Sequence, residues 1–353
     1  MACFFGSLVT RFAKTERQCI IAVMLITGLM SGFLSNTGTA AVLIPVVIGI
    51  AASFDFSRGK LLMPLVFAAA LGGNLSIIGA PGNLIGTNAL NELGIETGFF
   101  EYIGVGLPML VFGILYFAVF GYKLLPDNKN LVSADDDQFA AKDFSGVPVW
   151  KQTASLVILI LSILAMIFEK QIGVKLHVSA SVGAIILILT GVISEKEALR
   201  SIDLKTVFLF GGSLALASAL ETTGAGTLVA DAIIHALGDT PSPFLLLLVI
   251  WIVTCALTNF MSNTATTALM VPIAVALAQG VGADPRAVVV ATVIAGSCAY
   301  ATPIGMPANT MVVGIGGYSF RDYVKAGLPL IGVSFVILSL IHISEPTRLG
   351  MIS

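Results

Sequence analysis

The sequence SNTGTAAVLIPVVIGIA at residues 35–51 returns, at a constant offset of 227 positions, as SNTATTALMVPIAVALA at residues 262–278. Two further pairs of blocks recur in the same order along the chain. GAPGN at 79–83 matches GMPAN at 305–309 in the pattern G-x-P-x-N, and FFEYIGVGLP at 99–108 matches FRDYVKAGLP at 320–329. Three matched blocks in one order predict that the chain contains two copies of one structural repeat.

The composition is typical of a membrane protein. The chain has 353 residues, of which 57% are hydrophobic and 11% charged, whereas soluble domains carry roughly a quarter charged residues. Four stretches contain no charged residue, and each exceeds the roughly 20 apolar residues that a spanning helix needs; they are 18–54, 61–91, 240–283 and 287–320. We therefore predict an all-α polytopic membrane protein.

Charge and composition exclude several functions. A net charge of −2 offers no basic surface for nucleic acid. The four cysteines and three histidines are scattered, without a spacing typical of a disulfide, a zinc site or a hydrolase. We expect neither an enzyme nor a nucleic-acid partner. A channel is disfavoured as well, because hairpins that meet inside the membrane close a pathway.

The lysines and arginines outside the apolar stretches predict the topology. Fourteen would lie on one side of the membrane and three on the other, so the positive-inside rule places the fourteen in the cytoplasm. Stretch 18–54 has basic residues at both ends and is slightly short for two spans. It is predicted to be a re-entrant hairpin with its tip at Ser35-Asn36-Thr37. By the same reasoning 240–283 is a hairpin from the outer side, with its tip at Ser262-Asn263-Thr264.

The predicted organisation follows from these assignments. The first repeat covers 1–125 with hairpin 18–54 and broken helix 61–90, a cytoplasmic linker covers 126–151, and the second repeat covers 152–341 with hairpin 240–283 and broken helix 287–315. Single spans are expected at 104–122, 152–168, 177–194, 206–220 and 326–341. We expect a multi-pass protein of the inner (plasma) membrane that has the lipid bilayer as a partner.

The two repeats are predicted to be inverted. Residues 91–103 carry three glutamates and no cation, whereas their counterpart 316–325 carries Arg321 and Lys325. The two copies therefore face opposite sides of the membrane. Inverted repeats with broken helices mark secondary transporters, whose site lies at the repeat interface near the midplane.

The repeats also differ in length. The second copy has 106 residues before Thr258, whereas the first has only 30 before Ser31. By symmetry about 76 residues, roughly three helical segments, are expected to be missing at the N-terminus. The sequence HISEPTRLGMIS at 342–353 is expected to be a non-native tail, and the whole chain a fragment.

The chemistry of the two hairpin tips favours an anion together with a cation. Helix starts inside the membrane present free N–H groups and the positive end of the helix dipole. The charge-free stretches contain no Lys or Arg to neutralise a buried dianion. Co-bound Na⁺ would supply the missing charge, although an anion exchanger would share this absence.

At these residues the chain resembles the divalent-anion/sodium symporter family of the ion transporter superfamily, over roughly residues 10–341. The resemblance implies a homodimer, an elevator-type transport domain, and C4-dicarboxylate, citrate or sulfate as substrate. It implies two Na⁺ sites, one with Ser31, Ser35, Asn36 and Gly79 and the other with Thr258, Ser262, Asn263 and Gly305. It implies substrate contacts from Ser35, Asn36, Thr37, Ser262, Asn263, Thr264, Pro81 and Pro307.

The sequence departs from the G-T-P-P-N that is commoner in that family. Thr is replaced by Ala80 in one copy and by Met306 in the other, and the second Pro by Gly82 and Ala308. Two hydroxyl groups near the substrate are lost, which affects the identity of the substrate more than the fold. The preferred function is Na⁺-coupled uptake of a divalent anion, most simply a C4-dicarboxylate, by alternating access.

Three other transport functions stay open. One is Na⁺-independent dicarboxylate exchange, and another is transport of sulfate or citrate. The third is Na⁺/H⁺ antiport within the same superfamily. An antiporter is expected to place a carboxylate at the midplane, and the four charge-free stretches contain none.

Overall fold

Every regular element among the residues that the structure describes is a helix, which confirms the all-α prediction. The structure, a computed structural model, describes residues 15–128, 148–202, 204–238 and 242–344. Residues 1–14 of the first predicted repeat, most of the predicted linker and the end of the predicted tail lie outside these ranges. The chain forms two compact units, one of residues 1–140 with 209–353 and the other of residues 141–208.

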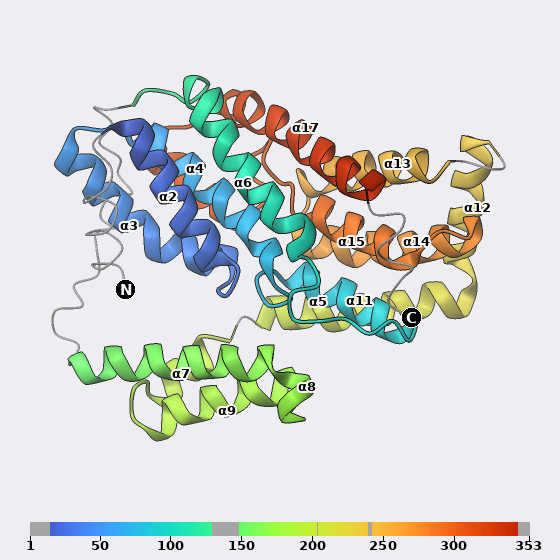
Figure 1. Cartoon of the computed structure of the whole chain (residues 1–353), viewed down its shortest axis with the longest axis horizontal. Coiled ribbons are helices and arrows are strands. Elements are labelled where there is room, and N and C mark those ends of the chain that lie inside the picture. Colours follow the sequence, from blue (N-terminus) through green and yellow to red (C-terminus); the bar gives the residue numbers. More distant parts are fainter. Residues whose placement is uncertain (1–14, 129–147, 203, 239–241, 345–353) are drawn as a thin grey trace. The chain divides into compact units, whose positions relative to one another are not determined.

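The larger unit contains the same succession of elements twice: a pair of helices joined by a tight turn, a helix that breaks, and one long helix (Figure 1). The first set is α2 (Glu16–Ser31), α3 (Asn36–Phe54), α4 (Arg58–Gly72), the 3-10 turn η1 (Gly73–Leu75), α5 (Pro81–Glu92) and α6 (Ile103–Val119), followed by η2 (Gly121–Lys123). The second set is α13 (Pro243–Thr258), α14 (Asn263–Val281), α15 (Pro285–Gly296), α16 (Pro307–Gly316) and α17 (Phe320–Ser344). Before it come α11 (Leu204–Thr223), which extends from the smaller unit, and α12 (Ala225–Leu237).

Local sequence explains where these helices begin. The Ser35 hydroxyl caps α3 by accepting from the Gly38 N–H at 3.1 Å, and Ser262 caps α14 in the same way. Helices α5 and α16 start with proline, whose missing N–H is not needed at that position. Helix α17 begins six residues before the predicted span 326–341, because Asp322 accepts from the Ser319 N–H at 2.9 Å and so caps an earlier start.

The two sets of helices exchange their second halves. Helix α5 packs against α14 and α15, whereas α16 packs against α3 and α4, and α6 packs against α17 (Figure 1). The first half of each broken helix therefore packs against the hairpin of its own repeat, and the second half packs against the hairpin of the other repeat. This exchange brings residues more than 200 positions apart, such as Asn36 and Met306, into contact.

The end of the first hairpin away from its tip is tied by charges. Lys60 Nζ lies 3.1 Å from the Glu16 carboxylate and 2.8 Å from that of Asp127. Glu16 also accepts from the Ser57 N–H at 2.8 Å. These contacts join the start of α2 to the start of α4. The tip lies at the other end of the hairpin and has no charged side chain.

The smaller unit contains α7 (Val149–Ile167), α8 (Glu169–Ile172), α9 (Leu176–Leu189) and α10 (Glu195–Arg200). Helices α7 and α9 pack where Gly183 meets the Ser162 side chain. Their outer faces carry exposed apolar residues, with Leu161 at 59% and Leu189 at 80% exposure. A small-residue contact between otherwise apolar surfaces is typical of helices packed in lipid.

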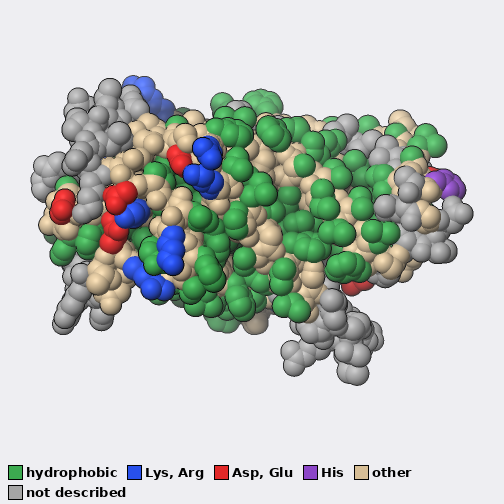
Figure 2. Space-filling model, turned by 90° about the horizontal axis from the view of Figure 1, so that it is seen from above, with side chains coloured by type: hydrophobic (Ala, Val, Ile, Leu, Met, Phe, Trp, Pro, Cys, Tyr) green, Lys and Arg blue, Asp and Glu red, His purple; other side chains and the backbone are tan. Residues whose placement is uncertain are grey.

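Four of the described helices are long and apolar enough to cross a membrane: α3, α7, α14 and α17 from Phe320 to Leu340. Figure 2 shows hydrophobic side chains over much of the visible surface, with the visible lysine and arginine side chains toward the left of the view. The exposed hydrophobic residues of α6 include Leu107, Val111, Phe112, Leu115 and Val119. So large an apolar surface suits a multi-pass membrane protein.

Candidate functional site

The first oxygen cluster lies where α2 ends, α3 begins and α4 breaks. Ser31 Oγ lies 2.9 Å from Asn36 Oδ1 and 2.6 Å from the Ala69 carbonyl oxygen. The same side of the Asn36 amide lies 3.0 Å from the Ala69 oxygen and 3.2 Å from the Gly79 carbonyl oxygen. Ser31 is fully buried and Asn36 is 8% exposed. When Asn36 Oδ1 is on this side, it converges with Ser31 Oγ and the carbonyl oxygens of Ala69 and Gly79 in the interior. Only the Ser31 hydroxyl supplies a proton, and such a set of oxygen ligands suits a hard cation.

The second oxygen cluster repeats this arrangement where α13 ends, α14 begins and α15 breaks. Thr258 Oγ1 lies 2.9 Å from Asn263 Oδ1 and 2.5 Å from the Gly296 carbonyl oxygen. Gly305 approaches the same helix end, because a Cβ placed on it would lie 2.7 Å from the Thr258 carbonyl oxygen. Neither cluster contains a charged side chain.

Buried side chains hold the break after α4 in place. Asn83 Nδ2 donates to the carbonyls of Gly73 at 2.8 Å and Ser76 at 2.7 Å. The Tyr102 hydroxyl donates to the Asn83 carbonyl at 2.8 Å, and Ser76 Oγ donates to the Gly32 carbonyl at 2.5 Å. Because buried carbonyls released by a helix break need donors, these bonds fix the loop between η1 and α5.

The break after α15 has the matching set of bonds. Asn309 Nδ2 donates to the carbonyls of Ala299 at 2.7 Å and Thr302 at 3.0 Å. The Tyr323 hydroxyl donates to the Asn309 carbonyl at 2.9 Å, and Thr302 Oγ1 donates to the Asn259 carbonyl. Each break is thus joined to the tip of its own hairpin and to the long helix that follows it.

The helix ends give the site an alternating electrostatic pattern. Helices α2 and α4 end at the first cluster, and α13 and α15 end at the second. Their C-terminal carbonyls carry the negative end of the helix dipole, which favours a cation. Helices α3, α5, α14 and α16 begin beside the clusters, and the first-turn N–H groups that remain uncapped favour an anion. Cation and anion positions are therefore adjacent.

Contacts between the two halves close the site. Asn36 Nδ2 lies 3.9 Å from Met306 Sδ, so the tip of the first hairpin meets the second break. On the other side, a Cβ placed on Gly82 would lie 2.9 Å from Thr267 Oγ1, so the second hairpin meets the first break. A side chain at position 82 would therefore require the Thr267 side chain to shift.

The structure places the sequence-predicted residues in two groups. Ser31, Asn36 and Gly79 come together in the first cluster, as Thr258 and Asn263 do in the second, where Gly305 also approaches. The hydroxyls of Ser35 and Ser262 instead cap α3 and α14. The other predicted substrate contacts lie at the first residues of helices, where Thr37, Thr264 and Pro81 are half-buried and Pro307 is exposed.

Sequence reasoning missed the carbonyls of Ala69 and Gly296. These two residues are separated by the same 227 positions as the two SNT motifs, so the repeat itself contains the signal that would have found them. It also missed the contact of Met306 with Asn36, for which the sequence contains no comparable signal. Among the described residues no group of three or more His, Cys, Asp and Glu could hold a metal ion.

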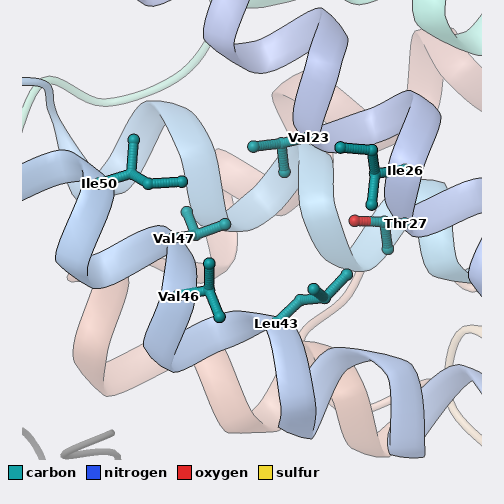
Figure 3. Close-up of a pocket in the computed structure, with 7 residues that line it drawn as sticks. All are labelled: Val23, Ile26, Thr27, Leu43, Val46, Val47 and Ile50. Carbon is teal, nitrogen blue, oxygen red and sulfur yellow. The ribbon is translucent and has the colours of Figure 1, made fainter. Parts of the chain in front are cut away.

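A small pocket between the arms of the first hairpin does not fit an anion. It is lined by Val23, Ile26, Thr27, Leu43, Val46, Val47 and Ile50 (Figure 3). The Thr27 hydroxyl points into it and has no hydrogen-bond partner. One hydroxyl among apolar side chains cannot replace the hydration of a dianion, so the hairpin tips remain the candidate site.

Comparison with known proteins supports a transport role. A family model described as citrate transporter matches residues 3–295. An uncharacterized transporter of Haemophilus influenzae is 30% identical over 336 residues, which cover 91% of this chain and 71% of that protein. The sodium-dependent dicarboxylate transporter SdcS of Staphylococcus aureus strain USA300 is 26% identical over 384 residues, covering 98% of this chain and 72% of that protein.

Proposed function

We propose that this chain, which belongs to the citrate transporter family, couples the uptake of a small divalent anion to Na⁺, with a C4-dicarboxylate as the substrate. The membership confirms the family resemblance and makes the protein a transporter rather than an enzyme. The substrate, the coupling ion and the ligands assigned below are the parts that we propose.

The observation that carries the proposal is the pair of buried oxygen clusters. Each combines a hydroxyl, an Asn side-chain amide and a helix-end carbonyl, and neither contains a charged group. We assign Na⁺ to both clusters, with Ser31, Asn36, Ala69 and Gly79 as ligands in the first and Thr258, Asn263, Gly296 and Gly305 around the second. Neutral oxygens at the negative ends of helices bind a monovalent cation without requiring deprotonation.

The anion is assigned to the helix starts beside these clusters. Free N–H groups at the starts of α3, α5, α14 and α16 would meet its carboxylates, together with the side chains of Thr37 and Thr264. Two Na⁺ ions would balance the charge of a dianion in a site that has no Lys or Arg. Removing either charge type would leave the other buried and unpaired, which is the physical basis for obligatory coupling.

The names of related proteins support this assignment. The SdcS relatives are described as sodium-dependent dicarboxylate transporters and the family as citrate transporters. From the family resemblance we also propose the plasma membrane as the location and a homodimer with elevator-type movement. Cross-linking of the protein in native membranes tests the dimer.

The experiment is uptake of radiolabelled succinate by the whole transporter in proteoliposomes, with and without an inward Na⁺ gradient. We expect gradient-dependent uptake in the native protein and a large loss in Ser31→Ala and in Thr258→Ala. Thr27→Val is the matched control, because Thr27 lies one helical turn before Ser31, is equally buried and has no hydrogen-bond partner.

The outcomes separate the alternatives. Uptake that needs internal dicarboxylate but no Na⁺ would identify an exchanger, and Na⁺-driven uptake of citrate or sulfate but not succinate would change the substrate. Equal loss in Thr27→Val and Ser31→Ala would show that the hairpin was merely disturbed, and the ligand assignment would fail.

A further inference from the structure

The Asn36 amide faces two different environments on its two sides. One amide atom lies 2.9 Å from Ser31 Oγ, 3.0 Å from the Ala69 carbonyl oxygen and 3.2 Å from the Gly79 carbonyl oxygen. The other lies 3.9 Å from Met306 Sδ, at the residue that precedes the start of α16. The oxygen and the nitrogen of an amide can exchange places by a half-turn about one bond, so the side chain has two possible orientations.

Each orientation suits a different state of the first cluster. With Nδ2 toward the cluster, the amide can donate to the carbonyls of Ala69 and Gly79. In the other orientation, neither carbonyl receives a hydrogen bond from Asn36. With Oδ1 toward the cluster, the oxygens repel one another unless a cation lies among them. Binding of a cation therefore favours Oδ1 on the cluster side and turns the N–H groups toward Met306.

The same rotation changes what an anion meets. With the N–H groups turned toward the start of α16, the amide adds donors at a helix end that already favours negative charge. With Oδ1 turned that way, its lone pairs repel a carboxylate. We infer that the half-turn of the Asn36 amide couples cation binding to anion binding at the first tip, with Met306 as the residue that biases it. This inference rests on the proposed Na⁺-coupled function.

The thioether of Met306 is suited to this bias. Its sulfur is a weak hydrogen-bond acceptor and never a donor, so it favours the orientation in which the amide N–H groups face it. Met306 is 2% exposed and lies in the same buried cluster as the core residues around the first hairpin. A purely aliphatic side chain of similar volume would fill the space without favouring either orientation.

The two halves of the site differ at this point. The residue that corresponds to Met306 in the first break is Ala80, which has only a methyl group and cannot accept a hydrogen bond. Asn263 at the second tip therefore has no thioether from the corresponding position. We therefore expect the Na⁺ affinity of the first site, but not that of the second, to depend on the residue at this position in the break of the other repeat.

The test compares Met306→Leu with Met109→Leu in the whole transporter, reconstituted in proteoliposomes. Met109 is 1% exposed in α6, and its side chain belongs to neither oxygen cluster. We expect Met306→Leu to raise the Na⁺ concentration for half-maximal succinate uptake roughly two- to tenfold, which corresponds to the net strength of one hydrogen bond. At saturating Na⁺ its succinate KM should stay near the native value, and Met109→Leu should change neither quantity.

A second variant tests the donor role of the amide directly. Asn36→Asp keeps the shape but places oxygen on both sides and adds a negative charge, so a succinate increment that it retained would count strongly against the donor role. We expect Na⁺ still to raise its thermal stability in detergent, while succinate adds no further increase. Unchanged Na⁺ dependence in Met306→Leu, or a succinate increment retained in Asn36→Asp, would overturn the inference. Absence of any Na⁺ dependence in the native protein would instead overturn the proposed function on which it rests.

Discussion

The helix that follows the second break offers a sharp test of how the break is supported. In α17, Gly327 lies against the backbone of the break. A Cβ placed on Gly327 would lie 2.8 Å from the Ala301 nitrogen and still closer to the Tyr300 carbonyl. Because these are backbone atoms, no flexible side chain can move aside. Gly332 lies in the same helix, and a Cβ placed there would have no atom within 4 Å.

The expected magnitude follows from comparing Gly327→Ala with Gly332→Ala. Both changes favour the helix by about 1 kcal/mol, because Ala loses less backbone entropy than Gly. Overpacking adds a cost of about 1–3 kcal/mol only at position 327. The helix propensity cancels in the comparison, so Gly327→Ala should be less stable than Gly332→Ala by about 1–3 kcal/mol.

The assay is thermal unfolding of the two purified full-length variants, followed by the Na⁺ dependence of uptake. The Ala301 N–H donates to Asn259 Oδ1 at 2.8 Å in the second hairpin tip. A displaced break should therefore lower Na⁺ affinity in Gly327→Ala as well as stability. Equal unfolding temperatures and equal Na⁺ dependence for the two variants would refute the claim that α17 supports the break.

Two further predictions concern buried polar groups. Thr27→Val should raise the free energy of unfolding by about 1 kcal/mol, because a buried hydroxyl without a partner is replaced by a methyl group of the same shape; thermal unfolding in detergent measures it. Asn309→Ala should lower that free energy by about 2–4 kcal/mol, because the carbonyls of Ala299 and Thr302 lose their donor. In the same measurement, Asn309→Ala as stable as the native protein would contradict this role.

Several features of this protein could be predicted from the sequence because they depend on local composition. Charge-free stretches indicated an all-α membrane protein, and the structure has helices throughout the described residues. The SNT motifs predicted the hairpin tips, since Ser is a strong helix cap and Asn and Thr follow it directly. The G-x-P-x-N motifs predicted the breaks, because a proline starts a helix more readily than it continues one. The family resemblance then implied Ser31 and Thr258, which the repeat aligns with each other, as candidate ligands.

Other features depended on how the helices pack, and only the tertiary structure decided them. The carbonyls of Ala69 and Gly296 join the clusters because α4 and α15 end at those points. Every residue type has a backbone carbonyl, so the residue type does not indicate which carbonyls become ligands. The exchange of half-helices brings Met306 to Asn36 across 270 positions of sequence. A contact of that kind is set by the packing of one repeat against the other, so the sequence of neither repeat contains it.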